Sequence, residues 1–118
     1  MNKDCICKIR NVYRAIATFE DTLQRQFGLN INEAMLLSTV AGHENISSGE
    51  IAEELSLTHS NTSKVIVALE NSGLIRRKLC KEDKRCMRFG ITQKGKDLLT
   101  HVNCDQVQVP ENLKKIAG

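Results

Sequence analysis

Five consecutive charged residues at 81–85, Lys-Glu-Asp-Lys-Arg, constrain the fold of this chain more than any other feature of its sequence. A run of this kind cannot be buried, yet it lies between two segments, 74–80 and 86–91, that resemble strands. In the second segment, apolar side chains occupy every other position from Met87 to Ile91. The pattern therefore predicts a β-hairpin whose tip is charged.

Basic residues are concentrated around this hairpin. Residues 74–96 hold nine Lys or Arg and two acidic residues, a local charge of +7, whereas the whole chain of 118 residues carries only +3. A charge run is often just a solvated surface, and that reading stays open. Concentrated basicity on a chain whose remainder is acidic instead favours a polyanionic partner such as a phosphate backbone.

Composition indicates one globular domain over residues 1–118. Hydrophobic residues make up 41% and charged residues 26% of the chain, which are values of ordinary globular proteins. The N-terminus is polar where a signal peptide would be apolar, and the longest apolar run, at 65–69, is too short to span a bilayer. We therefore expect a cytoplasmic protein.

Helical patterns precede the hairpin. An apolar stripe predicts a first helix over 4–27 that ends at Gly28. A second helix follows from about Asn32, whose side chain is expected to cap it, to 42. Ser47-x-x-Glu50 has the spacing of a capping box and predicts a third helix over 48–55. A fourth helix begins at Thr58 or His59 and stops at Gly73. The last two helices predict a helix-turn-helix over about 48–73, with the hairpin as a wing over about 74–92.

The predicted fold class is mostly α within α+β. It is a winged helix-turn-helix with a two-stranded β-hairpin wing and a three-helical core, plus N-terminal and C-terminal dimerisation helices. Thr92 is expected to cap the last helix, which continues to 102, and a weak helical turn is expected at 111–117. The elements predicted to form a dimer are 4–27 and 93–117.

The start of the fourth helix is entirely polar, and helix-turn-helix proteins place this end against base edges. Amide and hydroxyl side chains can bond base edges or phosphates, and lysine can pair with phosphate. The candidate DNA-binding residues here are His59, Ser60, Asn61, Thr62, Ser63 and Lys64. Ser47 and Ser48, at the start of the third helix, are candidates for further contacts with the DNA backbone.

The wing supplies the other candidate DNA contacts, Lys84, Arg85 and Arg88. The narrow minor groove of a duplex attracts cationic side chains held out on such a hairpin. Asp83, two residues before Arg85, is expected to orient the guanidinium of that residue through charge-assisted hydrogen bonds.

These residues together resemble the winged helix-turn-helix of the MarR family of bacterial transcription regulators. The resemblance covers about half of the chain, from Ser48 to Leu99. It includes the wing signature Asp-x-Arg, here Asp83 and Arg85, and the Thr-x-Lys-Gly that follows Ile91. It implies a homodimer on a pseudo-palindromic operator, with recognition helices in the major groove and wing arginines in the flanking minor grooves.

The chain differs from the usual family pattern at two places. Family members usually have a long C-terminal helix that builds the dimer with the first helix, whereas about 25 residues follow the second strand here. The Asp-Pro that usually precedes the wing acid is replaced by Lys81-Glu82.

Five cysteines in a chain expected to be cytoplasmic favour reduced thiols over a disulfide framework. Cys5 and Cys7 at the first helix, and Cys80 and Cys86 beside the wing, are candidates for redox sensing. The alternatives are incidental thiols, or a metal site that joins Cys5 and Cys7 to His101 and Cys104.

We find no motif of a catalytic site and expect no enzyme activity, cofactor or resident metal. The sequence predicts a sequence-specific double-stranded DNA-binding transcription regulator, a repressor that acts as a homodimer and responds to a small-molecule or oxidant effector. Two alternatives stay open. One is a winged-helix module that binds an acidic protein, and the other is a thiol- or metal-responsive regulator.

Overall fold

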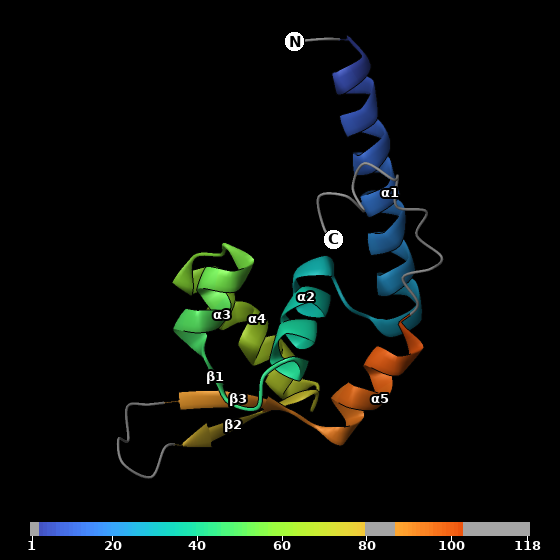
Figure 1. Ribbon diagram of the computed structural model, residues 1–118. Coiled ribbons are helices and arrows are strands. Elements are labelled where there is room, and N and C mark those ends of the chain that lie inside the picture. The colour runs from blue at the N-terminus through green and yellow to red at the C-terminus, as the bar shows by residue number, and fades with distance from the viewer. Residues whose placement is uncertain (1–2, 80–86, 103–118) are drawn as a thin grey trace. The chain divides into compact units, whose positions relative to one another are not determined.

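The computed structural model describes residues 3–79 and 87–102. The chain divides into two compact units, one of which contains residues 29–101 and the other α1 (Lys3–Phe27). The larger unit contains α2 (Ile31–Ala41), β1 (Ile46–Ser47), α3 (Ser48–Leu55), α4 (His59–Asn71), β2 (Ile75–Leu79), β3 (Met87–Ile91) and α5 (Gln93–His101). This order confirms the mostly helical winged-helix prediction (Figure 1).

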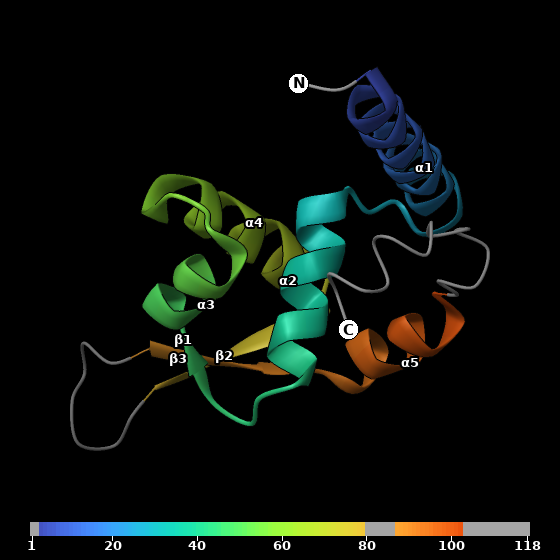
Figure 2. The same cartoon turned by 45° about the horizontal axis from the view of Figure 1, so that its top comes forward.

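In the larger unit, α2, α3 and α4 contact one another on one face of the sheet (Figure 2). α2 also contacts β3 and α5, and α4 contacts β2. The core between these elements is made of side chains that are almost wholly shielded from water: Leu36, Leu37, Val40, Ile46, Ile51, Ile66, Leu69, Leu74, Ile75 and Phe89. Burial of such side chains is the main favourable term in folding.

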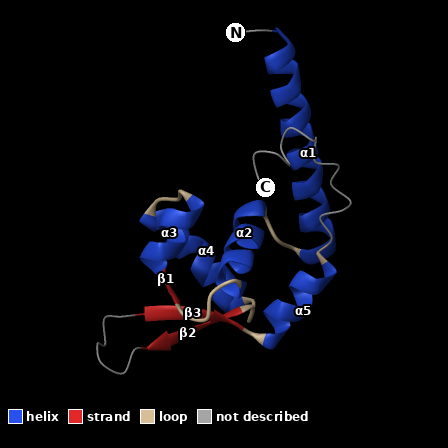
Figure 3. Ribbon diagram, in the orientation of Figure 1, coloured by secondary structure: helices blue, strands red, loops and turns tan. Residues whose placement is uncertain are grey.

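The sheet has three strands in the order β1-β3-β2, all antiparallel (Figure 3). The sequence predicted a two-stranded wing, and β1 is the addition. Ile46 pairs with Phe89 and Ser47 with Arg88, so β1 joins the entrance of α3 to β3.

Local signals place the helices where the sequence predicted them, with one correction. Ser47 forms the predicted capping box with Glu50, and the side chain of Thr58 caps α4. Gly28 and Gly73 follow α1 and α4 with φ of +68° and +74°, a conformation that favours glycine. The prediction that Asn32 caps α2 is wrong, because Asn30 is the cap.

The helix α1 carries the predicted apolar stripe. Ile6, Ile9, Tyr13 and Ile16 are 40–72% exposed, and their spacing places them on one side of the helix. Farther along the stripe, Phe19 and Phe27 are partly buried and Leu23 is buried. The exposed part of the stripe is therefore its N-terminal half.

Candidate nucleic-acid interface

The start of α4 presents polar side chains to solvent, as the sequence predicted. The Thr58 hydroxyl accepts a hydrogen bond from the Asn61 amide at 3.1 Å and so begins the helix. His59, Ser60, Asn61, Ser63 and Lys64 are exposed. The first turn of α4 contains no acidic residue, so the positive end of its helix dipole is not neutralised from within this turn.

Thr62 differs from its neighbours, because its side chain is only 1% exposed. Its hydroxyl donates to the Thr58 carbonyl oxygen at 2.8 Å. Thr62 lies four residues before Ile66 and seven before Leu69, which are also buried, so it belongs to the core face of α4. The prediction that Thr62 contacts DNA is therefore wrong, because its side chain faces the core and not the exposed side of α4.

Ser47 and Ser48 meet α4 in a groove of about 380 Å³. Ser63, Ile66 and Val67 line it from α4, and Arg77, Met87 and Phe89 line it from the sheet. The fold thus brings together Ser47, Ser48 and Ser63, three candidate DNA-binding residues from the starts of two separate helices. Hydroxyl groups and a guanidinium on one groove can donate hydrogen bonds to phosphate oxygens.

Arg77 also lines this groove. It is one of the nine basic residues at 74–96, but it was not among the DNA-binding residues predicted from the sequence. Its Nη2 donates to the Glu70 carboxylate at 2.8 Å, and Nη1 lies 3.0 Å from the Met87 sulfur. The guanidinium also lies 5.5 Å from the centre of the Phe89 ring. Alternation along β2 could have identified it, because Arg77 shares its face with the buried Ile75.

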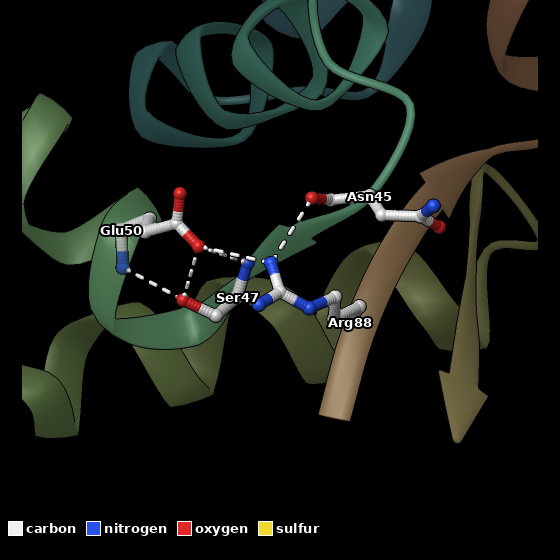
Figure 4. Close-up of polar contacts among 4 residues, drawn as sticks. All are labelled: Asn45, Ser47, Glu50 and Arg88. Atoms are coloured by element: carbon white, nitrogen blue, oxygen red, sulfur yellow. Dashed lines mark hydrogen bonds and ion pairs between the residues drawn. The ribbon is translucent and has the colours of Figure 1, made fainter. Parts of the chain in front are cut away.

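Arg88, a predicted DNA contact, is bonded within the protein in this structure (Figure 4). Its Nη1 donates to Glu50 Oε1 at 3.1 Å and to the Asn45 carbonyl oxygen at 3.3 Å. Its side chain remains 39% exposed. Arg88 therefore links β3 to the first turn of α3 while keeping part of its guanidinium accessible.

Glu50 joins this link to the helix cap. The Ser47 hydroxyl donates to Glu50 Oε1 at 2.9 Å and accepts from the Glu50 amide at 3.2 Å. The hydrogen bonds that the hydroxyl and the backbone amide of Ser47 donate to this carboxylate, with a smaller contribution from the positive charge of Arg88, lower the pKa of the Glu50 carboxyl below its ordinary value of 4.5. Glu50 is thus ionised at neutral pH, and it holds both the capping box and Arg88.

Several predicted site residues lie outside the described residues. They are Asp83, Lys84 and Arg85 of the wing, together with Cys80, Cys86 and Cys104. Cys5 and Cys7 are free and exposed on α1. His43 contacts the Glu54 carboxylate at 3.3 Å. Within residues 3–79 and 87–102, no three His, Cys, Asp or Glu side chains form a group that could hold a metal ion.

None of the helices formed by the described residues combines the length and the apolar character needed to cross a membrane.

Sequence relatives of the chain are transcription regulators by name. The HTH-type transcriptional regulator PapX of Escherichia coli is 26% identical over 106 residues, which cover 75% of this chain and 65% of PapX. The transcriptional repressor MprA of E. coli strain K12 is 31% identical over 77 residues, which cover 64% of this chain and 44% of MprA. The chain thus spans less than two thirds of the length of either relative.

Solved structures show the same fold. The transcriptional regulator BldR of Sulfolobus solfataricus superposes with a TM-score of 0.77 at 24% identity, covering 99% of this chain and 93% of BldR. The S. aureus MepR–DNA complex gives a TM-score of 0.78 at 20% identity, covering 98% of this chain and 84% of MepR.

The model of the MarR family matches residues 27–85, which are half of the chain and include α2, α3, α4 and β2. The fold and the sequence relatives agree with this match. The chain therefore belongs to the MarR family.

Proposed function

We propose that this chain is a transcription regulator that binds double-stranded DNA at a specific, pseudo-palindromic sequence and acts in the cytoplasm as a homodimeric repressor, without enzyme activity. The observation that carries the proposal is the exposed polar start of α4 beside a groove that also contains Ser47, Ser48 and Arg77. The helix supplies side chains for base edges, and the groove supplies donors for the adjacent backbone.

In this arrangement, Asn61 has the best chemistry for base recognition. Its amide can donate to and accept from one adenine edge, and its side chain is exposed in the first turn of α4. Ser60, Ser63, Lys64 and His59 surround it as contacts to phosphates or bases. In the wing, we assign minor-groove binding to Lys84 and Arg85, with Asp83 as the residue that orients Arg85.

Repression is proposed because one relative, MprA, is named as a transcriptional repressor. A DNA-bound structural neighbour, the MepR–DNA complex, supports duplex DNA as the partner. The apolar stripe on α1 supports a homodimer, because exposed apolar side chains at helical spacing favour association with another apolar surface. The second copy of the chain would cover Ile6, Ile9, Tyr13 and Ile16.

Selection of bound duplexes from a random pool tests the proposal, followed by binding titrations of the selected site at several salt concentrations. We expect a two-fold symmetric site and an affinity that falls steeply as the salt concentration rises. The reason is that Lys and Arg side chains that bind DNA phosphates release the counterions condensed on the DNA. Asn61→Ala should weaken binding to the selected site by about 1–3 kcal/mol, and so should Arg85→Ala. Asn71→Ala, at the other end of α4, is the matched control. Affinity that is indifferent to both salt and sequence would support the alternative, a module for an acidic protein.

Sedimentation tests the homodimer. Tyr13→Glu places a charge in the exposed stripe and should shift the chain to monomer, whereas Asn11→Glu, outside the stripe, should leave the dimer intact. A wild-type chain that sediments as a monomer would contradict this part of the proposal. Repeating the DNA selection with an oxidant or zinc tests whether Cys5, Cys7, Cys80 or Cys86 makes the regulator responsive to thiol oxidation or metal.

A further inference from the structure

A second basic surface lies on the face of the sheet that points away from α4. Successive residues of a strand point to opposite faces, and Arg77 and Phe89 point toward the helices. Arg76 and Lys78 on β2 therefore share the other face with their partners Gly90 and Arg88 on β3. This outer face lies across the sheet from the groove assigned above to DNA.

The outer face is hollowed next to these cations. A depression of about 340 Å³ is lined by Arg76, Lys78 and Gly90 of the sheet, by Lys96 of α5, and by residues 41–45, which connect α2 to β1. Three cations from two elements, β2 and α5, thus converge on one space. Its volume lies at the lower end of the range of small-molecule sites.

Within the described part of the chain, Arg76 and Lys78 differ from the other basic residues of the sheet in having no acidic partner, and Lys96 of α5 has none either. Arg77 is paired with Glu70, and Arg88 with Glu50. Among the residues that the structure describes, no carboxylate forms an ion pair with Arg76, Lys78 or Lys96. The depression contains one carboxylate of its own, on Glu44, and a histidine, His43, that contacts Glu54. Positive charge therefore exceeds negative charge in this space by two.

The side chain of Lys78 lies over residue 90, which is glycine. A Cβ at Gly90 would lie 3.4 Å from Lys78 Cε, 3.5 Å from Lys78 Nζ and 3.7 Å from the Glu44 carbonyl oxygen. The ammonium group of Lys78 therefore lies over the bare backbone of β3, inside the depression. On the same face, Lys78 is directly opposite Arg88, a like-charged pair that is unfavourable.

We propose that this depression binds a small anion that carries two or more negatively charged oxygen groups, of the phosphate or carboxylate class. Such a ligand would neutralise Arg76, Lys78 and Lys96 together, with the planar guanidinium able to bind two oxygens and the two ammonium groups able to adjust to the others. The proposal does not depend on DNA binding, because the depression and the groove lie on opposite faces of the sheet.

Titration of the ¹⁵N-labelled full chain with inorganic triphosphate or with citrate, at constant ionic strength, tests the proposal by NMR. The two anions separate a phosphate site from a carboxylate site. We expect saturable amide shifts centred on Gly42, Glu44, Gly90 and Lys96 for at least one anion. No saturable shift there at about 10 mM of either anion, which corresponds to binding weaker than about −3 kcal/mol, would overturn the proposal.

Variants localise the site. Arg76→Ala and Lys78→Ala should each weaken binding about tenfold, because each removes one of the three converging cations. Gly90→Ala keeps every charge but fills the floor of the depression, and it should also weaken binding. Lys8→Ala, which removes the same charge from α1, should not change it. Amide spectra of each variant confirm that the fold is kept.

A DNA titration separates this site from the proposed DNA interface. Arg76→Ala and Lys78→Ala should leave the affinity for the selected duplex within about twofold in the absence of the anion. If these variants lose DNA affinity and lower its dependence on salt while no small anion binds, the surface belongs to the DNA footprint and the proposal is wrong. Equal weakening of anion binding by Lys8→Ala would also overturn it, because the effect would then be one of net charge.

Discussion

Arg88 on β3 and Glu50 on α3 are 38 residues apart in the chain, yet Nη1 of Arg88 lies 3.1 Å from Oε1 of Glu50. The same carboxylate oxygen accepts from the amide of Ser47 at 3.3 Å and from its hydroxyl at 2.9 Å. The cap of α3 and the link between α3 and β3 therefore both depend on the ionised carboxylate of Glu50.

Stability should depend on pH through this carboxylate. The pKa of Glu50 is lowered in the folded chain, so its contribution to stability is complete above 4.5 and is lost as pH falls below that value through the lowered pKa. Glu50→Gln removes this contribution. We therefore expect the urea midpoints of wild type and Glu50→Gln to differ more at about pH 7 than at about pH 3. If the difference in urea midpoint were the same at both pH values, the pH dependence could not be assigned to the Glu50 carboxylate. Glu53→Gln, a neighbour whose carboxylate forms no ion pair in the described part of the chain, is the control.

Gly95→Ala should destabilise the chain although alanine favours helices. A Cβ at Gly95 would lie 2.3 Å from the Leu74 carbonyl oxygen and 2.7 Å from Ile91 Cγ1, so α5 would have to move away from the sheet. We expect the free energy of unfolding to fall by about 1–3 kcal/mol. Gly49→Ala is the matched control, since a Cβ there has no atom within 4 Å, and it should change stability by less than about 1 kcal/mol. Urea unfolding of the two variants measures both effects.

Thr58→Ala should lower the free energy of unfolding by about 1 kcal/mol, because α4 loses the hydroxyl that accepts from the Asn61 amide. Thr58→Ser keeps the hydroxyl and should recover most of the loss. Urea unfolding monitored by circular dichroism measures both variants. Similar losses in the two would show that the methyl group of Thr58, rather than its hydroxyl, is important.

Two adjacent arginines should differ in their effect on stability. Arg77 has an ion pair with Glu70 and contacts the Phe89 ring, so Arg77→Ala should cost about 0.5–2 kcal/mol. Arg76 points to the other face of the sheet and pairs with no carboxylate among the described residues, so Arg76→Ala should stay within about 0.5 kcal/mol of wild type. Chemical denaturation of both variants at the same salt concentration makes the comparison, and a larger loss from Arg76→Ala would contradict it.

Much of the fold could be predicted because its signals are local. The capping box at Ser47, the cap at Thr58 and the period change after Gly73 each occupy a few neighbouring residues, and the structure confirms the elements that they indicate. Asn30 had the same kind of signal, since Glu33 follows it at capping-box spacing, and the choice of Asn32 overlooked it.

The features that the sequence did not reveal arise from contacts between distant residues. β1 has only two residues, and it exists because Ile46 pairs with Phe89. The orientation of Arg88 toward Glu50 likewise follows from the packing of α3 beside β3 and has no local pattern. The burial of Thr62 could have been predicted from the sequence. Thr62 lies one turn before Ile66, on the same side of α4 as Ile66 and Leu69, which are buried.

The double use of Ile46 and Ser47 has a mechanical consequence. The same two residues complete the sheet and begin α3, so main-chain hydrogen bonds set the spacing between the first turn of that helix and β3. Any force that displaces α3 will be transmitted to the wing through the backbone.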